Sequence, residues 1–455
     1  MAETGAGPVS VLVVAIGGYG AHYLKALLAL AGPGPGAEAP GATDRQRPTD
    51  LLASRCRLAG VVDPMATQSP VWPLVSGLNV PVRSSIEEFY SEGHRADLAV
   101  ISSPIHWHVP QSIVALSNGS SVLCDKPLGA TIQEADELIE TRDRSGRWVM
   151  IGYQWSFSSA ILALKRDILA GLFGRPARCL ALCCWPRDVS YYGRNDWAGR
   201  LRDEATGRWV LDSPANNAMA HYLHNLFFVL GPEMHLSARP RTVQAELYRA
   251  YPIESCDTAI CRAMTEDGAE LLFYASHVTE RTIDPRFRLE FEDAVISCGE
   301  DEGSDIVAVG RNGQRKRYGS PEDTPQFQKL VAAIDRVSTR TVPCTHTVGA
   351  ELARPGGDAT IVCGPEAAMS QTLGVNGMHD SVSEVTCFPS SLVRREGAPE
   401  RLFVAGLDDL LVRCYENGIL PSEAGVEWAV AGRTVDLAGY RHFPGGARGP
   451  QGDRP

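Results

Sequence analysis

Short apolar runs alternate with helical patterns along the first 150 residues. Val9 to Ala15 is almost continuously apolar, which is typical of a strand that is buried on both faces of a sheet. Tyr19 to Leu30 follows with helical periodicity, and the same pair of patterns recurs up to a last strand at residues 149–153. Strands that alternate with helices in this way predict parallel βαβ units.

The pattern changes after about residue 160. Five strand-like runs follow each other closely between Val243 and Cys298, and short connections favour an antiparallel or mixed sheet. Helical stretches frame these runs, the last one at 402–416. We therefore predict an α/β fold, with an N-terminal Rossmann parallel sheet and a C-terminal α+β domain on an open, mainly antiparallel sheet. The predicted domains are residues 1–152 and 153–443, followed by a flexible tail at 444–455.

Composition and charge narrow the class of protein. Of the 455 residues, 44% are hydrophobic and 21% are charged, which excludes a mostly disordered chain. The formal net charge of -11 argues against a binder of nucleic acid or of anionic membranes. No apolar run approaches the ~20 residues that a membrane span needs.

Cysteine usage and the first residues of the chain bear on the compartment. Twelve cysteines are spread along the chain without a CxxC pair. The first ten residues carry Glu3 and no basic residue, which is the wrong charge for a secretory signal. We therefore expect a cytoplasmic protein with reduced thiols, and no metal site built from them.

The segment AIGGYG joins the first predicted strand to the first predicted helix. Gly17 and Gly20 take the second and third positions of the GxGxxG dinucleotide fingerprint, and Ala15 stands where the first glycine would be. Together with Gly18 and Tyr19, they would let a pyrophosphate approach the positive end of the helix. The alternative is a tight turn without a ligand, but a strand before and a helix after it favour dinucleotide binding.

Asp63 lies at the end of the second strand, where an acid would accept hydrogen bonds from the adenosine ribose hydroxyls. It is farther from the glycines than the usual ~20 residues. A Gly/Pro-rich insertion at 32–43 accounts for the excess. Because a carboxylate would repel a 2′-phosphate, NAD is favoured over NADP, although NADP stays possible. Alternatively, Asp63 only begins a turn before Pro64.

Two further motifs follow predicted strands, at the sheet edge where such folds bind ligands. SSPIHWHVP contains Ser103, Pro104 and His108, and LCDKPLG contains Asp125 and Lys126. A lysine between an acid and a proline is unusual in a chain with only five lysines. The alternatives are an ordinary strand-to-helix loop for the first motif and a solvated loop charge for the second.

The segment 213–231 reads as a helix that presents Asn217, His221 and His224 on one face. The alternative is a buried helix whose histidines cap or pack. A zinc site would need a third ligand and a base, as in HExxH, and neither is present. The loop before it, at 185–200, is rich in aromatic, arginine and asparagine side chains, including Tyr192 and Trp197, which suit a polyhydroxylated ring or simply form a long polar loop.

In this order, the motifs resemble those of the Gfo/Idh/MocA oxidoreductases, the family of glucose–fructose oxidoreductase and inositol dehydrogenase. The resemblance covers about residues 9–232. The (S/T)PxxxH element of the family matches residues 103–108, and its EKP signature appears as Asp125, Lys126 and Pro127. The resemblance implies that these two motifs contribute to cofactor binding.

Two other motifs of that family depart from its pattern. The GYQxR segment appears at 152–156 without its arginine, and it places Tyr153 and Trp155 at the substrate. The DxxxH pair falls on Asn217 and His221, so the family's carboxylate is replaced by an amide. An amide can still hydrogen-bond a hydroxyl, although it carries no charge.

These residues and the resemblance predict an NAD(P)-dependent oxidoreductase of the CH-OH donor class that acts on a sugar, amino sugar or cyclitol. His221 would take the hydroxyl proton as a general base, and Lys126 would stabilise the growing negative charge on the oxygen. Asn217 would orient the substrate or His221. We also expect a homo-oligomer.

Two alternatives stay open. Some members of this family use bound NAD transiently, so that a sugar elimination or glycosidic cleavage becomes easy without net oxidation. The chain could also be a regulatory protein that retains the dinucleotide pocket without catalysis, which the missing carboxylate at Asn217 motivates.

Overall fold

A computed structural model describes residues 7–31, 55–300, 303–339 and 361–445 of the chain. The insertion at 32–43 and most of the predicted tail lie outside these residues. The chain forms two compact units, and each is discontinuous in sequence. The first unit comprises Met1–Asp125, Glu137–Gln154 and Pro325–Pro365, and the second comprises Lys126–Asp136, Trp155–Thr324 and Glu366–Pro455.

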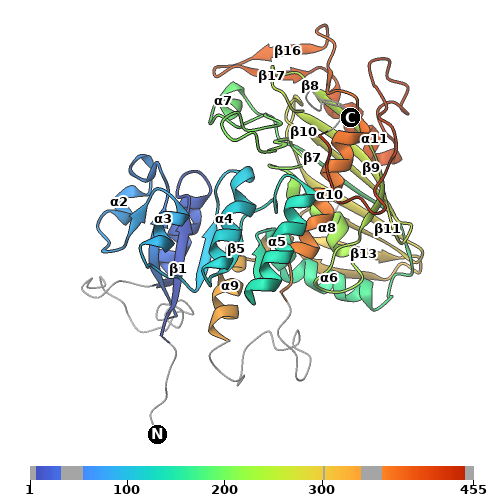
Figure 1. The fold of residues 1–455 in the computed structure, drawn as a ribbon. Coiled ribbons are helices and arrows are strands. Elements are labelled where there is room, and N and C mark those ends of the chain that lie inside the picture. The colour runs from blue at the N-terminus through green and yellow to red at the C-terminus, as the bar shows by residue number, and fades with distance from the viewer. Residues whose placement is uncertain (1–6, 32–54, 301–302, 340–360, 446–455) are drawn as a thin grey trace, which may run out of the picture. The chain divides into compact units, whose positions relative to one another are not determined.

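A six-stranded parallel sheet forms the centre of the first unit (Figure 1). Its strand order, β3-β2-β1-β4-β5-β6, is that of a Rossmann fold and confirms the predicted fold class of this half. All six residues of the first strand are buried, as its unbroken apolar run predicts. The strands are β1 Val9–Val14, β2 Cys56–Val62, β3 Val82–Arg83, β4 Leu98–Ile101, β5 Ser121–Cys124 and β6 Val149–Ile151.

Helices flank this parallel sheet, and one of them returns from late in the sequence. Helix α9 contacts β1, β4 and β5 through an apolar face that includes Leu330, Ala333 and Ile334 (Figure 1). The first unit therefore differs from a domain that ends near residue 152. The helical elements up to the second unit, with α9, are α1 Gly20–Ala31, η1 Ala66–Gln68, α2 Trp72–Val75, α3 Ile86–Ser91, α4 Ile105–Ser117, α5 Ile132–Ser145, η2 Gln154–Phe157 and α9 Gln328–Ser338.

The segment after Asp125 belongs to the second unit because Asn376 holds it there. The Asn376 side chain accepts from the backbone N–H of Ile132 at 2.9 Å and donates to the carbonyl of Ala130 at 2.8 Å. Both ends of this amide are therefore used in fixing the segment that follows Lys126.

The second unit is built on a ten-stranded, mostly antiparallel sheet, as predicted. The strand order is β14-β13-β12-β11-β7-β10-β9-β8-β15, with β18 also paired to β8. Only the β7–β10 and β8–β15 pairs of this sheet are parallel. The strands are β7 Pro176–Cys184, β8 Pro240–Arg249, β9 Thr258–Thr265, β10 Glu270–Ser276, β11 Ile283–Phe291, β12 Ala294–Cys298, β13 Ile306–Gly310, β14 Arg315–Gly319, β15 Thr386–Cys387 and β18 Val435–Asp436.

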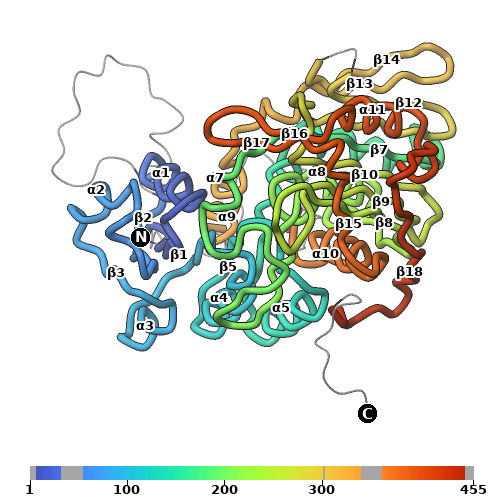
Figure 2. The backbone as a smooth tube through the Cα atoms, turned by 90° about the horizontal axis from the view of Figure 1, so that it is seen from above, coloured from blue at the N-terminus to red at the C-terminus, as the bar shows by residue number. Residues whose placement is uncertain are grey.

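Residues after 380, for which the sequence offers no account, cover one face of this sheet. Alternate residues of a strand face opposite sides, and Leu180, Leu182 and Cys184 of β7 pack in one core with helix α11. Helix α11 contacts β7 and β10, whereas α8 also contacts β7 (Figure 2). The remaining elements are α6 Ser159–Leu169, α7 Val189–Tyr192, α8 Ala220–Val229, η3 Pro321–Asp323, α10 Pro365–Ser381, β16 Val393–Glu396, β17 Arg401–Val404 and α11 Leu407–Asn417.

The predicted helix at 402–416 is only partly correct. Its first residues form strand β17, which pairs with β16, and the helix begins at Leu407. Gly406, with φ 75°, precedes the helix and separates the two elements. Among the described residues, no helix combines the length and apolar character that a membrane span requires.

Candidate functional site

The glycine turn of the first unit, residues 15–20, has the geometry of a dinucleotide-binding turn. Ala15 adopts a left-handed φ of 63°, at the position where the fingerprint has its first glycine. Gly20 begins helix α1, and a Cβ added there would lie 1.9 Å from the carbonyl oxygen of Ala15. Only glycine therefore allows the helix to start this close to the strand.

Space above the turn and an acid beside it fit a dinucleotide. A Cβ added to Gly17 or Gly18 would meet nothing within 4 Å, so the backbone N–H groups at the helix start are open to an approaching pyrophosphate. The Asp63 carboxylate accepts from the backbone N–H of Ile16 at 2.8 Å and of Met65 at 2.7 Å. The acid is thus fixed against the turn, as the ribose role requires.

Replacing Ala15 with glycine should stabilise the protein. A side chain in the left-handed region costs about 1–2 kcal/mol, which glycine would remove. The greater conformational freedom of glycine in the unfolded chain offsets part of this gain. We expect Ala15→Gly to raise the free energy of unfolding in urea by about 1 kcal/mol. Ala29→Gly, at an exposed position inside helix α1, is the matched control and should lower it by about the same amount. A destabilised Ala15→Gly protein would contradict the strain.

Asp125 is held in a buried ion pair that the sequence does not reveal. Its Oδ1 atom lies 3.3 Å from Nζ of Lys329 and accepts from the hydroxyl of Tyr23 at 3.2 Å. Lys329 is 1% exposed and also donates to the carbonyl of Gly152 at 3.0 Å. Burial lowers the pKa of Lys329, and the Asp125 carboxylate opposes that change. Lys329 reads in sequence only as one residue of an amphipathic helix.

Tyr19 and the SPIHWH motif also take definite places in the first unit. The Tyr19 hydroxyl accepts from Gln326 at 2.9 Å, and its ring stacks on Phe327. Helix α4 begins at Ile105 with Pro104 as its N-cap, so the motif forms a helix start rather than a loop. Buried His108 pairs through Nε2 with the carbonyl oxygen of Ser103 at 2.8 Å. The role of Ser103, Pro104 and His108 in cofactor binding stays a prediction.

The structure brings two of the three residues predicted for catalysis into contact, and all three lie in the second unit. Nζ of Lys126 donates to the backbone carbonyl of Asn217 at 2.6 Å and lies 3.4 Å from its side-chain oxygen. Helix α8 begins only at Ala220, so Asn217 lies in the turn before it rather than on its face as predicted, whereas half-buried His221 lies in its first turn. Asn217 in turn donates to Asp212, a buried acid that the sequence analysis does not single out.

His224 is a structural histidine of this helix. It is buried, its Nε2 pairs with the hydroxyl of Ser156 at 2.9 Å, and its ring stacks on Phe228. Burial lowers the pKa of His224 to about 3, and the nearby Lys165 ammonium lowers it further. A histidine held neutral in this way is a poor general base near pH 7.

This low pKa predicts an acid sensitivity. The unfolded chain protonates His224 below about pH 6.5 and the folded protein does not, so the folded state loses stability as pH falls from 6.5 towards 3. His224→Phe removes that dependence. From pH 7.5 to pH 5, the free energy of unfolding of the wild type should fall by about 2 kcal/mol more than that of the variant, measured in urea. Parallel pH profiles of the two proteins would contradict a neutral His224.

The side chains predicted for substrate binding lie in different surroundings. Tyr153 is fully buried in the first unit. Trp155 donates from Nε1 to Glu322 at 2.6 Å and packs edge-on against Tyr222. Tyr192 packs against Tyr251, and the guanidinium of Arg194 lies over the ring of Trp197. Their contact with a substrate stays a prediction.

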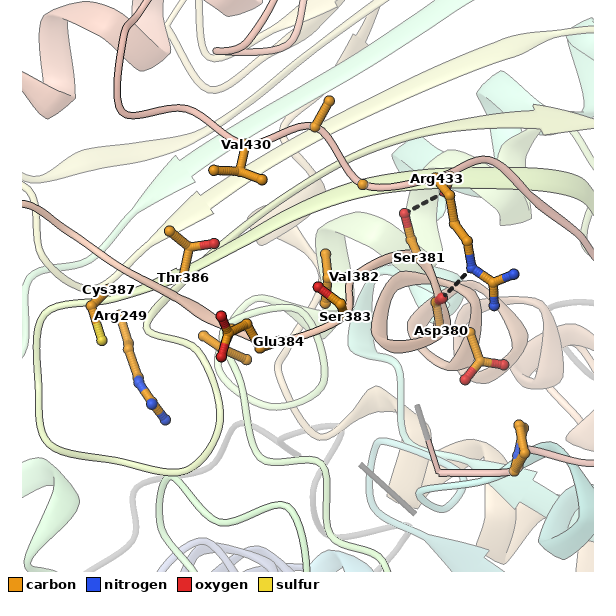
Figure 3. A pocket seen from close by; sticks show the side chains of 14 residues that line it. Arg249, Asp380, Ser381, Val382, Ser383, Glu384, Thr386, Cys387, Val430 and Arg433 are labelled. Carbon is orange, nitrogen blue, oxygen red and sulfur yellow. Dashed lines mark hydrogen bonds between the residues drawn. The ribbon is translucent and has the colours of Figure 1, made fainter. Parts of the chain in front are cut away.

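A pocket in the second unit lies away from these residues. It has a volume of about 720 Å³ and is lined mainly by residues 380–387 and 430–433, with Arg249 (Figure 3). Nε of Arg433 donates to the backbone carbonyl of Asp380 at 3.1 Å, and the backbone carbonyl of Arg433 accepts from the hydroxyl of Ser381 at 2.6 Å. These contacts tie the C-terminal segment to the end of α10, and no predicted site residue lines the pocket.

Within the described residues, no cluster of three or more histidine, cysteine or acidic side chains is placed to hold a metal ion. The eleven described cysteines are all free, and only Cys387 is exposed.

Comparison with known proteins identifies the first part of the chain. Residues 9–153 match the model of the Gfo/Idh/MocA family, described as an oxidoreductase family with an NAD-binding Rossmann fold. This match confirms the family predicted from the motifs.

Curated relatives share part of the chain. A scyllo-inositol 2-dehydrogenase (NADP(+)) of Bacillus subtilis is 21% identical over 55% of this chain and 65% of its own length. A 2,7-anhydro-N-acetylneuraminate hydratase of Mediterraneibacter gnavus is 23% identical over 37% of this chain and 41% of its own. The chain thus spans less than two thirds of the length of these relatives.

Solved structures show the same fold over most of the chain. The WlbA dehydrogenase of Bordetella pertussis, in complex with NADH and UDP-GlcNAcA, matches with a TM-score of 0.59 and 16% identity over 82% of this chain and 95% of its own. A UDP-N-acetylglucosamine 3-dehydrogenase of Acidithiobacillus ferrooxidans gives a TM-score of 0.57 and 18% identity over 81% and 96%. At this identity the likeness establishes the fold.

Proposed function

Because residues 9–153 match the model of the Gfo/Idh/MocA family of NAD-binding oxidoreductases, we propose that the protein is an NAD-dependent sugar or cyclitol dehydrogenase. The observation that carries the proposal is the joint position of Lys126 and Asn217 next to the helix that bears His221. An ammonium and an imidazole are the two groups that oxidation of a secondary alcohol requires besides the hydride acceptor.

Each residue has a distinct role in the proposed reaction. When bound to the turn at residues 15–20, NAD supplies the acceptor for the hydride that leaves the substrate carbon. Lys126 holds the substrate hydroxyl and lowers the cost of the negative charge that grows on its oxygen. His221 accepts the hydroxyl proton, and Asn217 fixes the direction of the Lys126 ammonium. In the reverse direction the same groups reduce a keto carbon.

The position of Asp63 favours NAD over NADP. Its carboxylate is fixed by two backbone N–H groups beside the glycine turn. A 2′-phosphate placed there would face a like charge. Fluorescence titration of both dinucleotides should give the lower dissociation constant for NAD, and equal binding of NADP would contradict this role of Asp63.

A second candidate is a reaction without net oxidation, in which a sugar is eliminated or cleaved while NAD is regenerated on the enzyme. The relatives that favour it are the hydratase and a glycosyl hydrolase family 109 protein of Shewanella, 24% identical over 25% of this chain.

One assay separates the two candidates. The protein is incubated with NAD and a panel of sugars, amino sugars, their nucleotide-linked forms and cyclitols, with NADH followed by absorbance and products by mass spectrometry. A dehydrogenase forms one keto product per NADH. A split or dehydrated product without NADH would replace the proposal by the second candidate, and no change in any compound would leave NAD binding as the only function.

We further propose a cytoplasmic location and self-association. Free, mostly buried thiols are compatible with a reducing compartment. Because α11 covers one face of the second sheet, self-association would use another surface, such as the exposed cross-strand pair Val295 and Val309. Sedimentation at micromolar concentration measures the state, and a monomer would contradict the proposal.

A further inference from the structure

Asp212 is a buried carboxylate whose two oxygen atoms face different partners. It is 2% exposed. Its Oδ1 atom accepts from Nδ2 of Asn217 at 2.7 Å. Its Oδ2 atom accepts from the backbone N–H of Gly199 at 2.7 Å, and Nη2 of Arg194 lies 3.8 Å from the same oxygen. The acid therefore connects the loop at 185–200 to the residue that holds Lys126.

The hydrogen bond to Asp212 decides which way the amide of Asn217 points. An ionised carboxylate only accepts hydrogen bonds, so the Nδ2 end must face it. The Oδ1 end then faces Lys126, whose Nζ lies 3.4 Å away and also donates to the Asn217 backbone carbonyl at 2.6 Å. Two oxygen acceptors on one residue thus fix the ammonium, and one of them is aimed by Asp212.

We propose that Asp212, acting through the amide of Asn217, supplies the negative charge that positions the Lys126 ammonium. It is a positioning residue, and its part in the reaction rests on the oxidoreductase function proposed above. The resemblance implies a carboxylate at position 217, and here the charge comes from five residues earlier in the chain.

Electrostatics support a coupling between the two charges. Burial raises the pKa of Asp212, whereas Arg194, the N–H of Gly199, the amide of Asn217 and Lys126 all lower it. Lys126 is therefore close enough to favour the ionised acid, and the ionised acid must favour protonated Lys126 equally. Arg194 is the competing cation, and Asp212 also faces Tyr191, Tyr192 and Cys256, whose pKa values are raised by burial and by its charge.

An amide between the two charges has a chemical consequence. A carboxylate in direct contact with Lys126 would pair with the ammonium and cancel much of the positive potential of that ammonium. Because the Asn217 amide lies between them, Asp212 still orients the lysine but leaves more of the positive potential of the ammonium for the substrate oxygen. Asn217→Asp would place two carboxylates next to each other, and such a pair holds a shared proton.

A test that needs no substrate is the pKa of Lys126 itself. Trace acetylation with acetic anhydride at a series of pH values, followed by peptide mass spectrometry, measures this pKa, and exposed Lys316 in the same sample is the internal reference. Asp212→Asn should lower the pKa of Lys126 by about 1 pH unit, and Asn217→Asp should raise it. Asp203→Asn is the matched control, since that carboxylate accepts from Thr206 in the same part of the chain. Asp203→Asn should leave the pKa of Lys126 unchanged.

The reciprocal exchange tests the role in the reaction. Asp212→Asn and Asn217→Asp should each lower kcat about 10-fold or more with the NAD dissociation constant unchanged, and the double variant, which again has one carboxylate near Lys126, should regain part of the loss. A merely structural Asp212 would give no such recovery. An unchanged pKa of Lys126 in folded Asp212→Asn, or a double variant no better than either single one, would overturn the proposal. If Asp212→Asn does not fold, the sign of the change in Asn217→Asp decides.

Failure of the proposed function is distinguishable from failure of this inference. The acetylation experiment reports the coupling between Asp212 and Lys126 even when no compound of the panel reduces NAD. In that case the positioning of Lys126 by Asp212 stands and the dehydrogenase proposal falls.

Discussion

Lys126→Met should lower turnover by about 10²-fold or more while leaving the fold and NAD affinity nearly intact. Methionine keeps most of the length of the side chain and removes its charge. The ammonium is held by two oxygens of Asn217, so it is directed rather than free in solvent. Loss of a directed donor removes its stabilisation of the growing charge on the substrate oxygen, which acts on kcat rather than on binding.

Two controls sharpen this experiment. Lys126→Arg keeps the charge but should not restore turnover, because the planar guanidinium is larger and cannot replace a point donor between two oxygens. Lys25→Met makes the same chemical change at an exposed position of helix α1 and should be silent. The initial rate of NADH formation and the NAD dissociation constant are measured for each. Full activity of Lys126→Met would refute the catalytic role and remove the main support for a dehydrogenase.

The sequence predicted the first sheet well because its strands carry their own signal. β1 is apolar at nearly every position, since helices cover both faces of a parallel sheet. The glycine turn was equally readable, because a strand, a tight turn and a helix start impose chemistry on adjacent residues. Its one departure, Ala15 with a positive φ, has no sequence signature beyond the missing glycine.

The second sheet was predicted less completely, and its central strand was missed. β7 pairs with both β10 and β11, yet its sequence PARCLALCC shows neither alternation nor β-branched residues. A strand that is covered on both faces shows no alternation of apolar and polar residues, and alanine, cysteine and leucine have little strand preference of their own. Tertiary packing, rather than local propensity, decides the structure there.

The candidate site was predicted where the chemistry is local and missed where it depends on distant contacts. Lys126, Asn217 and His221 were found from motifs. The contact between Lys126 and Asn217, however, joins residues that are 91 positions apart in the sequence. Asp212 carries no periodic signal because it lies in an irregular segment between β7 and α8. Only the folded chain shows that its carboxylate ends on Asn217.

Lys329→Met should be strongly destabilising, lowering the free energy of unfolding by about 3 kcal/mol or more. Lys329 is 1% exposed, and its Nζ pairs with Asp125 at 3.3 Å and with the carbonyl of Gly152 at 3.0 Å. Removing the cation leaves the Asp125 carboxylate buried without its counter-charge, with the hydroxyl of Tyr23 still donating to it. A buried charge without its counter-charge is costly, whereas loss of the whole pair costs much less.

A double-mutant cycle isolates this effect. Asp125→Asn combined with Lys329→Met removes both charges, so the double variant should be more stable than Lys329→Met alone. Lys316→Met is the matched control, because Lys316 pairs with Asp167 at the surface and the loss should stay below about 1 kcal/mol. The wild type, the two single variants, the double variant and the Lys316→Met control are all unfolded in urea at pH 7.5. Equal losses for Lys329→Met and Lys316→Met would mean that water reaches Asp125, which would contradict a buried ion pair between Lys329 and Asp125.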